Sequence, residues 1–278
     1  MRRYDFTISR RLLTLLAAGI LTISAQTGPA PAAGLTRAQK EEFLLKAKIV
    51  RAKEAAKGIT NTLRATLSDG QLTHDADIQR IDDTKRNYNN NNRVEVLFRD
   101  SWQYNVAAYK LDKLLGLNMI PATVDRPYQG SHASFTWWVD DVLMDEGQRQ
   151  SKKQQAPDKQ TWDYQMSIAN VFDQLIFNTD RNVGNLLYDK DWQMWMIDHS
   201  RAFRMDTNLL DAKALTRCDS ALLEKLKQLD AATLKKELGA YDIGSLQIKG
   251  LLARRDKIVR VFEQKGPSAM YTSPRRPE

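Results

Sequence analysis

The chain has 278 residues, of which 42% are hydrophobic and 27% charged, with a formal net charge of +8 and a single cysteine. This composition excludes collagen-like, disulfide-framework and wholly disordered proteins. The length is enough for one large hydrophobic core or two small ones. The positive net charge alone suggests a nucleic-acid-binding protein.

Part of that charge lies in residues 1–25, which have the pattern of a secretory signal peptide. Four Arg and one Asp precede an uncharged run, LLTLLAAGILTISA at 12–25. The run is shorter than the roughly 20 residues that a membrane-spanning helix needs. We predict that residues 1–25 are removed on export, which leaves no stable membrane span and places the protein in the periplasm or outside the cell. An uncleaved N-terminal anchor is the alternative.

Without residues 1–25 the chain keeps 38 basic and 33 acidic residues, a modest and interspersed excess. We therefore expect no nucleic-acid partner. The basic pairs Arg254–Arg255 and Lys235–Lys236 are predicted to lie on solvated helix faces. Residues 26–35 are rich in Pro, Ala and Gly, as is typical of a linker.

The part after the linker is predicted to be rich in strands. A capping box at Thr36 and Gln39 opens its first helix, and Ser68-Asp69-Gly70 is a turn between alternating segments. The predicted elements are a helix (36–57), a hairpin (59–67 and 72–81), a polar loop (82–92), a strand (94–98), a helix (102–117) and two strands (122–124 and 134–139).

The second half has mostly helical periodicity. Its predicted elements are a polar insertion (151–159), a helix (162–177), a hairpin (186–188 and 193–197), further helices (206–265) and a polar tail (266–278). The fold class is therefore α+β, with a small β-rich N-lobe over residues 36–139 and a larger, mostly helical C-lobe over residues 140–265.

Three polar residues between apolar stretches carry the candidate chemistry. Asp180 and Asn185 follow the helix at 162–177, and Asp198 ends the second strand of the predicted hairpin. Each alone is an ordinary turn or cap residue. Together they match phosphoryl transfer, in which one carboxylate receives a hydroxyl proton while an amide and a second carboxylate bind magnesium. The spacing Asp-x-x-x-x-Asn is that of the protein-kinase catalytic loop.

Three stretches, at 105–121, 172–185 and 197–203, resemble atypical kinases of the secretory-pathway type, the casein and xylosyl kinases, and more distantly HipA and the phosphatidylinositol kinases. The resemblance implies a bilobal kinase-like fold, ATP, and Mg or Mn. It also implies that Asp180 is the catalytic base and that Asn185 and Asp198 bind the metal. Trp138 and Val139 would lie in the hinge beside adenine.

The sequence departs from this family where ATP phosphates are bound. The strand Lys and helix Glu that such kinases pair correspond to Gln79 and Asn105, so an amide pair replaces the ion pair. No Gly-rich loop is present, and the turn with Ser68 and Gly70 is the tight turn available to cover phosphates. The candidate replacement cations are Arg64, Arg80, Lys85 and Arg99, with Glu95 as a partner.

Other chemistries fit less well. The run Asp198-His199-Ser200 is no hydrolase triad, because consecutive strand residues point to opposite faces, and three scattered His and one Cys make no zinc spacing. The sequence predicts an exported Mg-dependent phosphotransferase that acts on a hydroxyl of a protein, sugar or lipid. The alternatives are an inactive pseudokinase that binds nucleotide or acts as a scaffold, and a binding protein without nucleotide.

Overall fold

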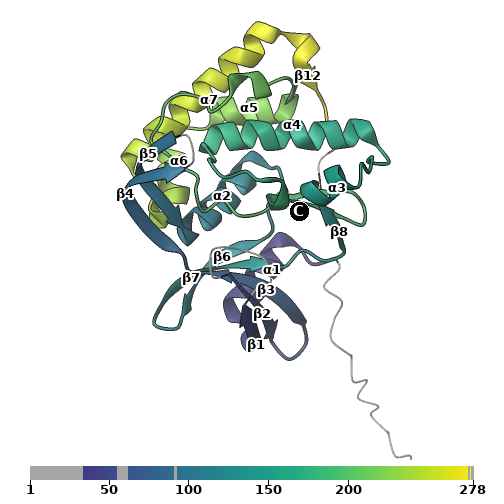
Figure 1. Ribbon diagram of the computed structural model, residues 1–278, viewed down its shortest axis with the longest axis vertical. Helices are drawn as coiled ribbons and strands as arrows, with labels where there is room; N and C mark the ends of the chain where they lie inside the picture. The colour runs from purple at the N-terminus through teal and green to yellow at the C-terminus, as the bar shows by residue number, and fades with distance from the viewer. Residues whose placement is uncertain (1–33, 55–61, 91–92, 275, 277–278) are drawn as a thin grey trace, which may run out of the picture.

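The structure, a computed structural model, describes residues 34–54, 62–90, 93–274 and 276 (Figure 1). Its N-terminal part is built on an antiparallel sheet and its C-terminal part is mostly helical, so the predicted α+β class is confirmed. The predicted signal peptide, and most of the predicted linker, lie outside the described residues. Among the helices of the described ranges, none is long and apolar enough to cross a membrane.

Five strands form the N-terminal sheet in the order β1-β2-β3-β7-β6, and every neighbouring pair is antiparallel. Their bounds are Lys48–Glu54 (β1), Leu63–Ser68 (β2), Thr73–Gln79 (β3), Thr123–Tyr128 (β6) and Ser131–Trp137 (β7). The predicted hairpin is confirmed as β2 and β3, and the two later strands as β6 and β7.

The first helix, α1 (Arg37–Lys46), begins at the predicted capping box but is shorter than predicted. The Thr36 hydroxyl accepts a hydrogen bond from Gln39 N at 3.3 Å, and Gln39 Oε1 accepts one from Thr36 N at 2.8 Å. The helix was predicted to reach residue 57, yet β1 begins at Lys48 and pairs with β2. Because strand pairing satisfies the backbone from outside the segment, it outweighs the local helix preference of the Lys and Ala residues.

The predicted polar loop at 82–92 is wrong. Most of it is strand β4 (Asp82–Asn90), which pairs with β5 (Arg93–Ser101) in a two-stranded hairpin outside the main sheet. Pairing within a hairpin satisfies the backbone without requiring apolar side chains, so Asn-rich composition does not exclude it. The base of the hairpin is anchored, because Phe98 and Asp100 are buried.

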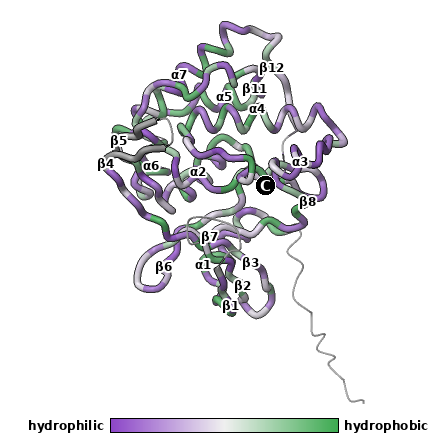
Figure 2. The backbone as a smooth tube through the Cα atoms, viewed as in Figure 1, coloured by the Kyte–Doolittle hydropathy of each residue, from purple (hydrophilic) through white to green (hydrophobic). Residues whose placement is uncertain are grey.

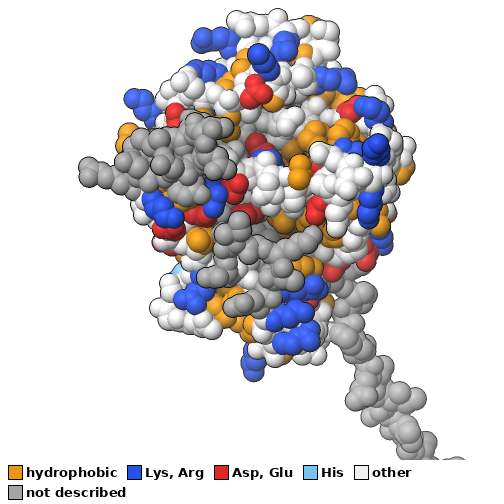
Figure 3. Space-filling view, viewed as in Figure 1, with side chains coloured by type: hydrophobic (Ala, Val, Ile, Leu, Met, Phe, Trp, Pro, Cys, Tyr) orange, Lys and Arg blue, Asp and Glu red, His pale blue; other side chains and the backbone are white. Residues whose placement is uncertain are grey.

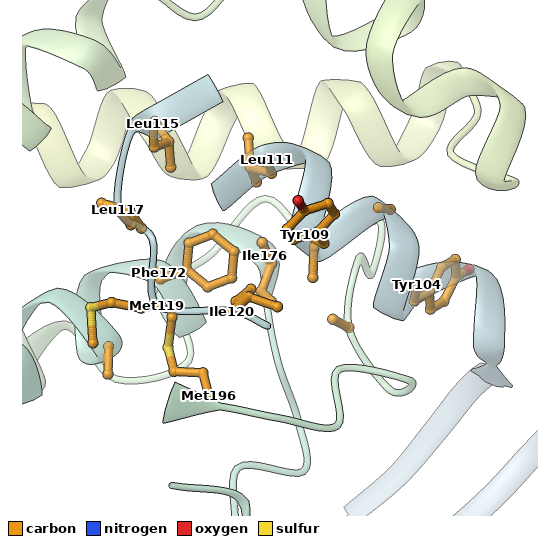
Figure 4. Close-up of a cluster of buried hydrophobic side chains, with 14 of the residues drawn as sticks. Tyr104, Tyr109, Leu111, Leu115, Leu117, Met119, Ile120, Phe172, Ile176 and Met196 are labelled. Carbon is orange, nitrogen blue, oxygen red and sulfur yellow. The ribbon is translucent and has the colours of Figure 1, made fainter. Parts of the chain in front are cut away.

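Helix α2 (Trp102–Leu115) follows β5 directly and confirms the helix predicted at 102–117; it ends at Gly116, whose φ of 65° is left-handed. Its buried face joins helix α4 (Lys159–Ile176) and the segment after α2 in one apolar cluster (Figure 4). The labelled members of the cluster are Tyr104, Tyr109, Leu111, Leu115, Leu117, Met119, Ile120, Phe172, Ile176 and Met196. A continuous core therefore joins the strand-rich and helical parts.

Besides α4, the described C-terminal residues form four further α-helices and two small sheets. Its remaining elements are β8 (Val142–Asp145), α3 (Glu146–Ser151), β9 (Leu186–Asp189), β10 (Met194–Met196), β11 (Cys218–Asp219), α5 (Ser220–Gln228), α6 (Ala231–Leu238), α7 (Ser245–Lys265) and β12 (Met270–Tyr271). The predicted hairpin is confirmed as β9 and β10, with β8 as a third strand. In Figure 2 the C-terminal helices alternate between hydrophilic and hydrophobic residues, as helices with one buried face do.

Two expectations for the C-terminal part are wrong. The predicted polar tail contains β12, which lies parallel to β11, and the Tyr271 ring stacks 4.1 Å from that of Tyr164. Arg254 is fully buried rather than solvated. Its guanidinium donates to the carbonyl of Leu175 at 2.8 Å and to that of Arg204 at 3.0 Å. The bond to Leu175 thereby caps a carbonyl group in the last turn of α4, where no later helix residue can donate to it.

Candidate active site

Helix α4 delivers the loop that carries Asp180 and Asn185. Phe177 ends the helix in a left-handed conformation, with φ 53°, and turns the chain into the loop. The Asp180 side chain is 39% exposed, and its Oδ2 lies 3.2 Å from Arg201 Nη1. Asn185 is buried, and its Nδ2 donates to the Asp180 carbonyl at 3.4 Å. The loop therefore presents one accessible carboxylate beside one sheltered amide.

Asp198 comes to the same place from the hairpin. The Ile197 N–H donates to the Asn185 carbonyl at 3.0 Å, so the end of the hairpin lies against the loop. Asp198 has a left-handed backbone, with φ 55°, and its Oδ1 accepts a hydrogen bond from Ser200 Oγ at 2.9 Å. The backbone contact thus brings together the segments that hold the three residues predicted from the motif.

Arg181 holds these segments together. Its Nε and Nη2 form a two-pronged ion pair with Asp173 of α4, at 2.8 and 3.0 Å. Its Nη1 donates to the carbonyls of Asn185, at 3.0 Å, and Ile197, at 2.9 Å. A planar guanidinium can make such bonds in several directions at once, which an ammonium cannot. Arg181 therefore sets the spacing between the loop and the hairpin.

His199 is a buried structural residue. Its Nε2 accepts a hydrogen bond from Arg181 Nη2 at 2.9 Å, because a guanidinium can only donate. Burial, and then the positive charge of Arg181, lower the pKa of His199 well below its usual value. The ring therefore stays neutral and serves as a hydrogen-bond acceptor for Arg181.

The predicted amide pair is present. Asn105 of α2 donates from Nδ2 to Gln79 Oε1 on β3, and both side chains are buried. The Asn105 Oδ1 accepts a hydrogen bond from the His199 N–H at 2.7 Å. The pair therefore links the sheet, α2 and the segment that follows Asp198, without contributing a charge.

The donors near Asp198 suit a divalent cation. In the described ranges no three His, Cys, Asp or Glu side chains cluster as a metal site. A set of oxygen donors at this place would include the Asn185 amide. Burial, and then the charge of Asp198, raise the pKa of Asp77 on β3 to about 7. This mutual repulsion of two carboxylates is what a bound cation would relieve.

The hinge residues and the predicted phosphate turn lie at the other end of β3. The Trp138 N–H donates to the Asp75 carbonyl at 3.1 Å, and Val139 follows it, half-buried. The turn with Ser68 and Gly70 joins β2 to β3, with Ser68 paired to Thr73. Thr73 and Gln79 are the two ends of β3, six residue steps apart, which is about 20 Å at ~3.3 Å per step. The structure therefore does not bring this turn to the amide pair.

All four candidate replacement cations have side-chain partners, and Arg64 pairs with Asp75 at 2.7 Å. Arg80 donates to Gln129 at 2.7 Å, Lys85 pairs with Asp83 at 2.9 Å, and Arg99 pairs with Asp82 at 2.9 Å and with Asp242 at 2.7 Å. The side chain of Glu95 lies outside the described residues. Arg64 alone of the four belongs to the three strands β1–β3.

Sequence reasoning missed Asp77, Arg181 and Arg201. Asp77 stands two residues before Gln79, so strand alternation places both on one face of the sheet. Arg181 follows Asp180 directly, and a turn residue with a long fork-shaped side chain could have been recognised as a tether. Arg201 binds Asp100 at 2.7 Å as well as Asp180, a contact across the chain that no local pattern indicates.

No protein-family model matches the chain, and neither does any curated protein sequence. Solved structures do match. A structure of hydra Fam20 with sugar has a TM-score of 0.59 and 17% identity, covering 84% of this chain and 92% of that one. A crystal structure of the Golgi casein kinase with Mn/ADP bound has a TM-score of 0.56 and 13% identity, covering 86% of this chain and 80% of that one.

The chain has the fold of these proteins. The kinase-like fold that the motifs predicted by resemblance is thereby confirmed. At 13–17% identity the match concerns the fold, while the chemistry depends on the residues described above.

Proposed function

We propose that the chain is a metal-dependent phosphotransferase that moves a phosphoryl group from a nucleotide to a hydroxyl group. The observation that carries the proposal is the meeting of Asp180, Asn185 and the Asp198 segment, tied by the hydrogen bonds of Arg181. A kinase-like fold, and a solved relative with Mn/ADP bound, support it.

The roles follow from exposure and chemistry. Asp180 is the accessible carboxylate, so it receives the proton of the acceptor hydroxyl, and Arg201 keeps it oriented. Asn185 and Asp198 hold Mg or Mn, which when bound neutralises developing charge on the phosphate oxygens. Gln79 and Asn105 position the sheet against the Asp198 segment.

The acceptor belongs to the class of alcohols. One solved relative is recorded with a sugar and another is named for casein, so saccharides and phosphorylatable proteins are the first acceptors to try. We also propose that residues 1–25 direct export, that residues 26–35 form a linker and that residues 36–139 and 140–265 act as the two lobes. Sequencing the N-terminus of the secreted protein tests the export step.

The test is nucleotide turnover with Mg²⁺ or Mn²⁺, measured beside nucleotide-dependent melting. Asp180→Asn should lower turnover by about 10²- to 10⁴-fold, the usual contribution of a general base, while melting shifts with nucleotide persist. Asp191→Asn, an exposed residue at the tip of the β9–β10 hairpin, is the matched control and should retain turnover. Equal turnover in wild type and Asp180→Asn would contradict the assignment.

A second function is favoured by the uncharged Gln79–Asn105 pair, which supplies no cation for phosphates. An inactive pseudokinase would show a nucleotide-dependent melting shift without turnover. The absence of any shift with ATP, GTP or their metal complexes would overturn both nucleotide functions.

A further inference from the structure

One face of strands β1–β3 carries charged side chains. Residues that pair directly across strands point to the same side of a sheet. Two rows cross the strands on this side. They are Lys53, Arg64 and Asp77, and then Arg51, Thr66 and Asp75. We call these six residues the roof face.

The roof face is on the side of the proposed active site. Gln79 continues the alternation of Asp75 and Asp77, and its side chain accepts a hydrogen bond from Asn105. The side-chain oxygen of Asn105 in turn accepts a hydrogen bond from the His199 N–H. The opposite side of the sheet is apolar: Ala65, Ala76 and Ile78 are buried in the core. The charges therefore lie on the same side of the sheet as Gln79 and the proposed active site.

A cavity of about 140 Å³ opens on the roof face, lined by Arg51, Lys53, Arg64, Thr66 and Asp75. Figure 3 shows Lys and Arg side chains gathered over β1 to β3. Three cations face one carboxylate in this lining, a net charge of +2. The cavity is several times the roughly 30 Å³ that a water molecule occupies, so it has room for an oxyanion.

One of the three cations is fixed in place, and the other two have no ion pair with a residue that the structure describes. Arg64 binds Asp75 through Nε and Nη2, both at 2.7 Å, and its guanidinium lies 4.2 Å over the Trp138 ring. Among the described residues, Arg51 makes one long hydrogen bond of 3.5 Å, to Thr66. Lys53 has no ion pair or hydrogen bond to any residue that the structure describes. Arg64 is thus held rigidly in the lining, whereas Arg51 and Lys53 pair with no acidic side chain that the structure describes.

We propose that the roof face binds the phosphate chain of the nucleotide through these cations, in place of the charge that Gln79 lacks. The inference rests on the proposed function and adds selectivity to it. A purine ring packs best between apolar side chains, and the roof face offers it charged ones. Recognition therefore depends on the phosphates, and the identity of the base contributes little.

Calorimetric titration of the whole purified chain with Mg²⁺ tests this, using ATP, GTP, inorganic tripolyphosphate and adenosine. We expect the three triphosphates to bind within a few fold of one another, adenosine to bind far more weakly, and added salt to weaken all three triphosphates. Lys53→Ala should weaken ATP and tripolyphosphate alike, by about tenfold, as loss of a hydrogen bond to a charged group does. Arg51→Ala should act in the same direction.

Lys48→Ala is the matched control, because it removes the same charge from the same strand outside the cavity lining. It should leave every affinity unchanged, and melting temperatures of all three variants report folding. Tight ATP binding that excludes GTP and tripolyphosphate, or that survives Lys53→Ala and Arg51→Ala, would overturn the roof-face proposal and leave the phosphotransferase intact. Failure of every nucleotide and of tripolyphosphate to bind would overturn both.

Discussion

Replacing Asp77 with Asn should stabilise the protein at alkaline pH and leave it almost unchanged at acid pH. Burial, and then the charge of Asp198, raise the pKa of the Asp77 carboxyl from 3.8 to about 7. Below pH 3.8 the carboxyl is protonated in the folded and the unfolded chain, so it adds no pH dependence. Between pH 3.8 and 7 the unfolded chain loses this proton first, and stability falls as pH rises.

The size of the effect follows from the shift. A change of about 3 pKa units corresponds to about 4 kcal/mol at ~1.4 kcal/mol per unit. Because Asp77 is only partly buried, water reduces this, and we expect a gain of about 2 kcal/mol for Asp77→Asn at pH 8. For a domain of this size that is about 4–8 °C in melting temperature.

The assay is thermal melting of wild type and Asp77→Asn at pH 5 and pH 8, with Asp191→Asn as a control that should show no pH-dependent difference. The gap between wild type and Asp77→Asn should also shrink when Mg²⁺ is added at pH 8, because a cation held at Asp198 would attract the Asp77 charge. A gap that is equal at both pH values, or that favours wild type at pH 8, would refute the electrostatic reasoning.

Two further variants test the framework around the site. Arg181→Lys keeps the positive charge but loses the two-pronged contact with Asp173 and the contacts with the two carbonyl groups. Turnover should fall at least tenfold, and urea unfolding should show a loss of about 2–4 kcal/mol in the free energy of unfolding. Unchanged turnover would contradict the positioning role of Arg181. Gly250→Ala in α7 should destabilise the fold by about 1–3 kcal/mol, because the added Cβ would lie 2.8 Å from the Met205 carbonyl oxygen. Ala ordinarily stabilises a helix relative to Gly, so a gain in stability would show that this contact relaxes freely.

The structure confirms the local features that the sequence predicted. These features depend on residues within a few positions of one another. They are the end of α2 at Gly116, the capping box at Thr36 and the hairpin after Asn185. The spacing between Asp180 and Asn185 was readable for the same reason. Because a short hairpin reverses the chain, it returns Asp198 to the loop that holds Asp180 and Asn185.

Features that depend on distant pairing were not readable. The second half of the predicted first helix is β1, because β2 pairs with it, and the Asn-rich segment is β4 because β5 does. Arg254 looked like a surface residue from its neighbours along the helix, yet the carbonyls that bind it come from other elements.

The same division holds for the candidate site. Motif spacing predicted a carboxylate, an amide and a second carboxylate in one place, since those residues are close along the chain. The register of β1, β2 and β3 decided that Lys53 and Arg64 share a face with Asp77, and a shift of one residue would have turned these charges to the other face of the sheet. Strand register depends on how whole segments pack, so no local pattern contains it.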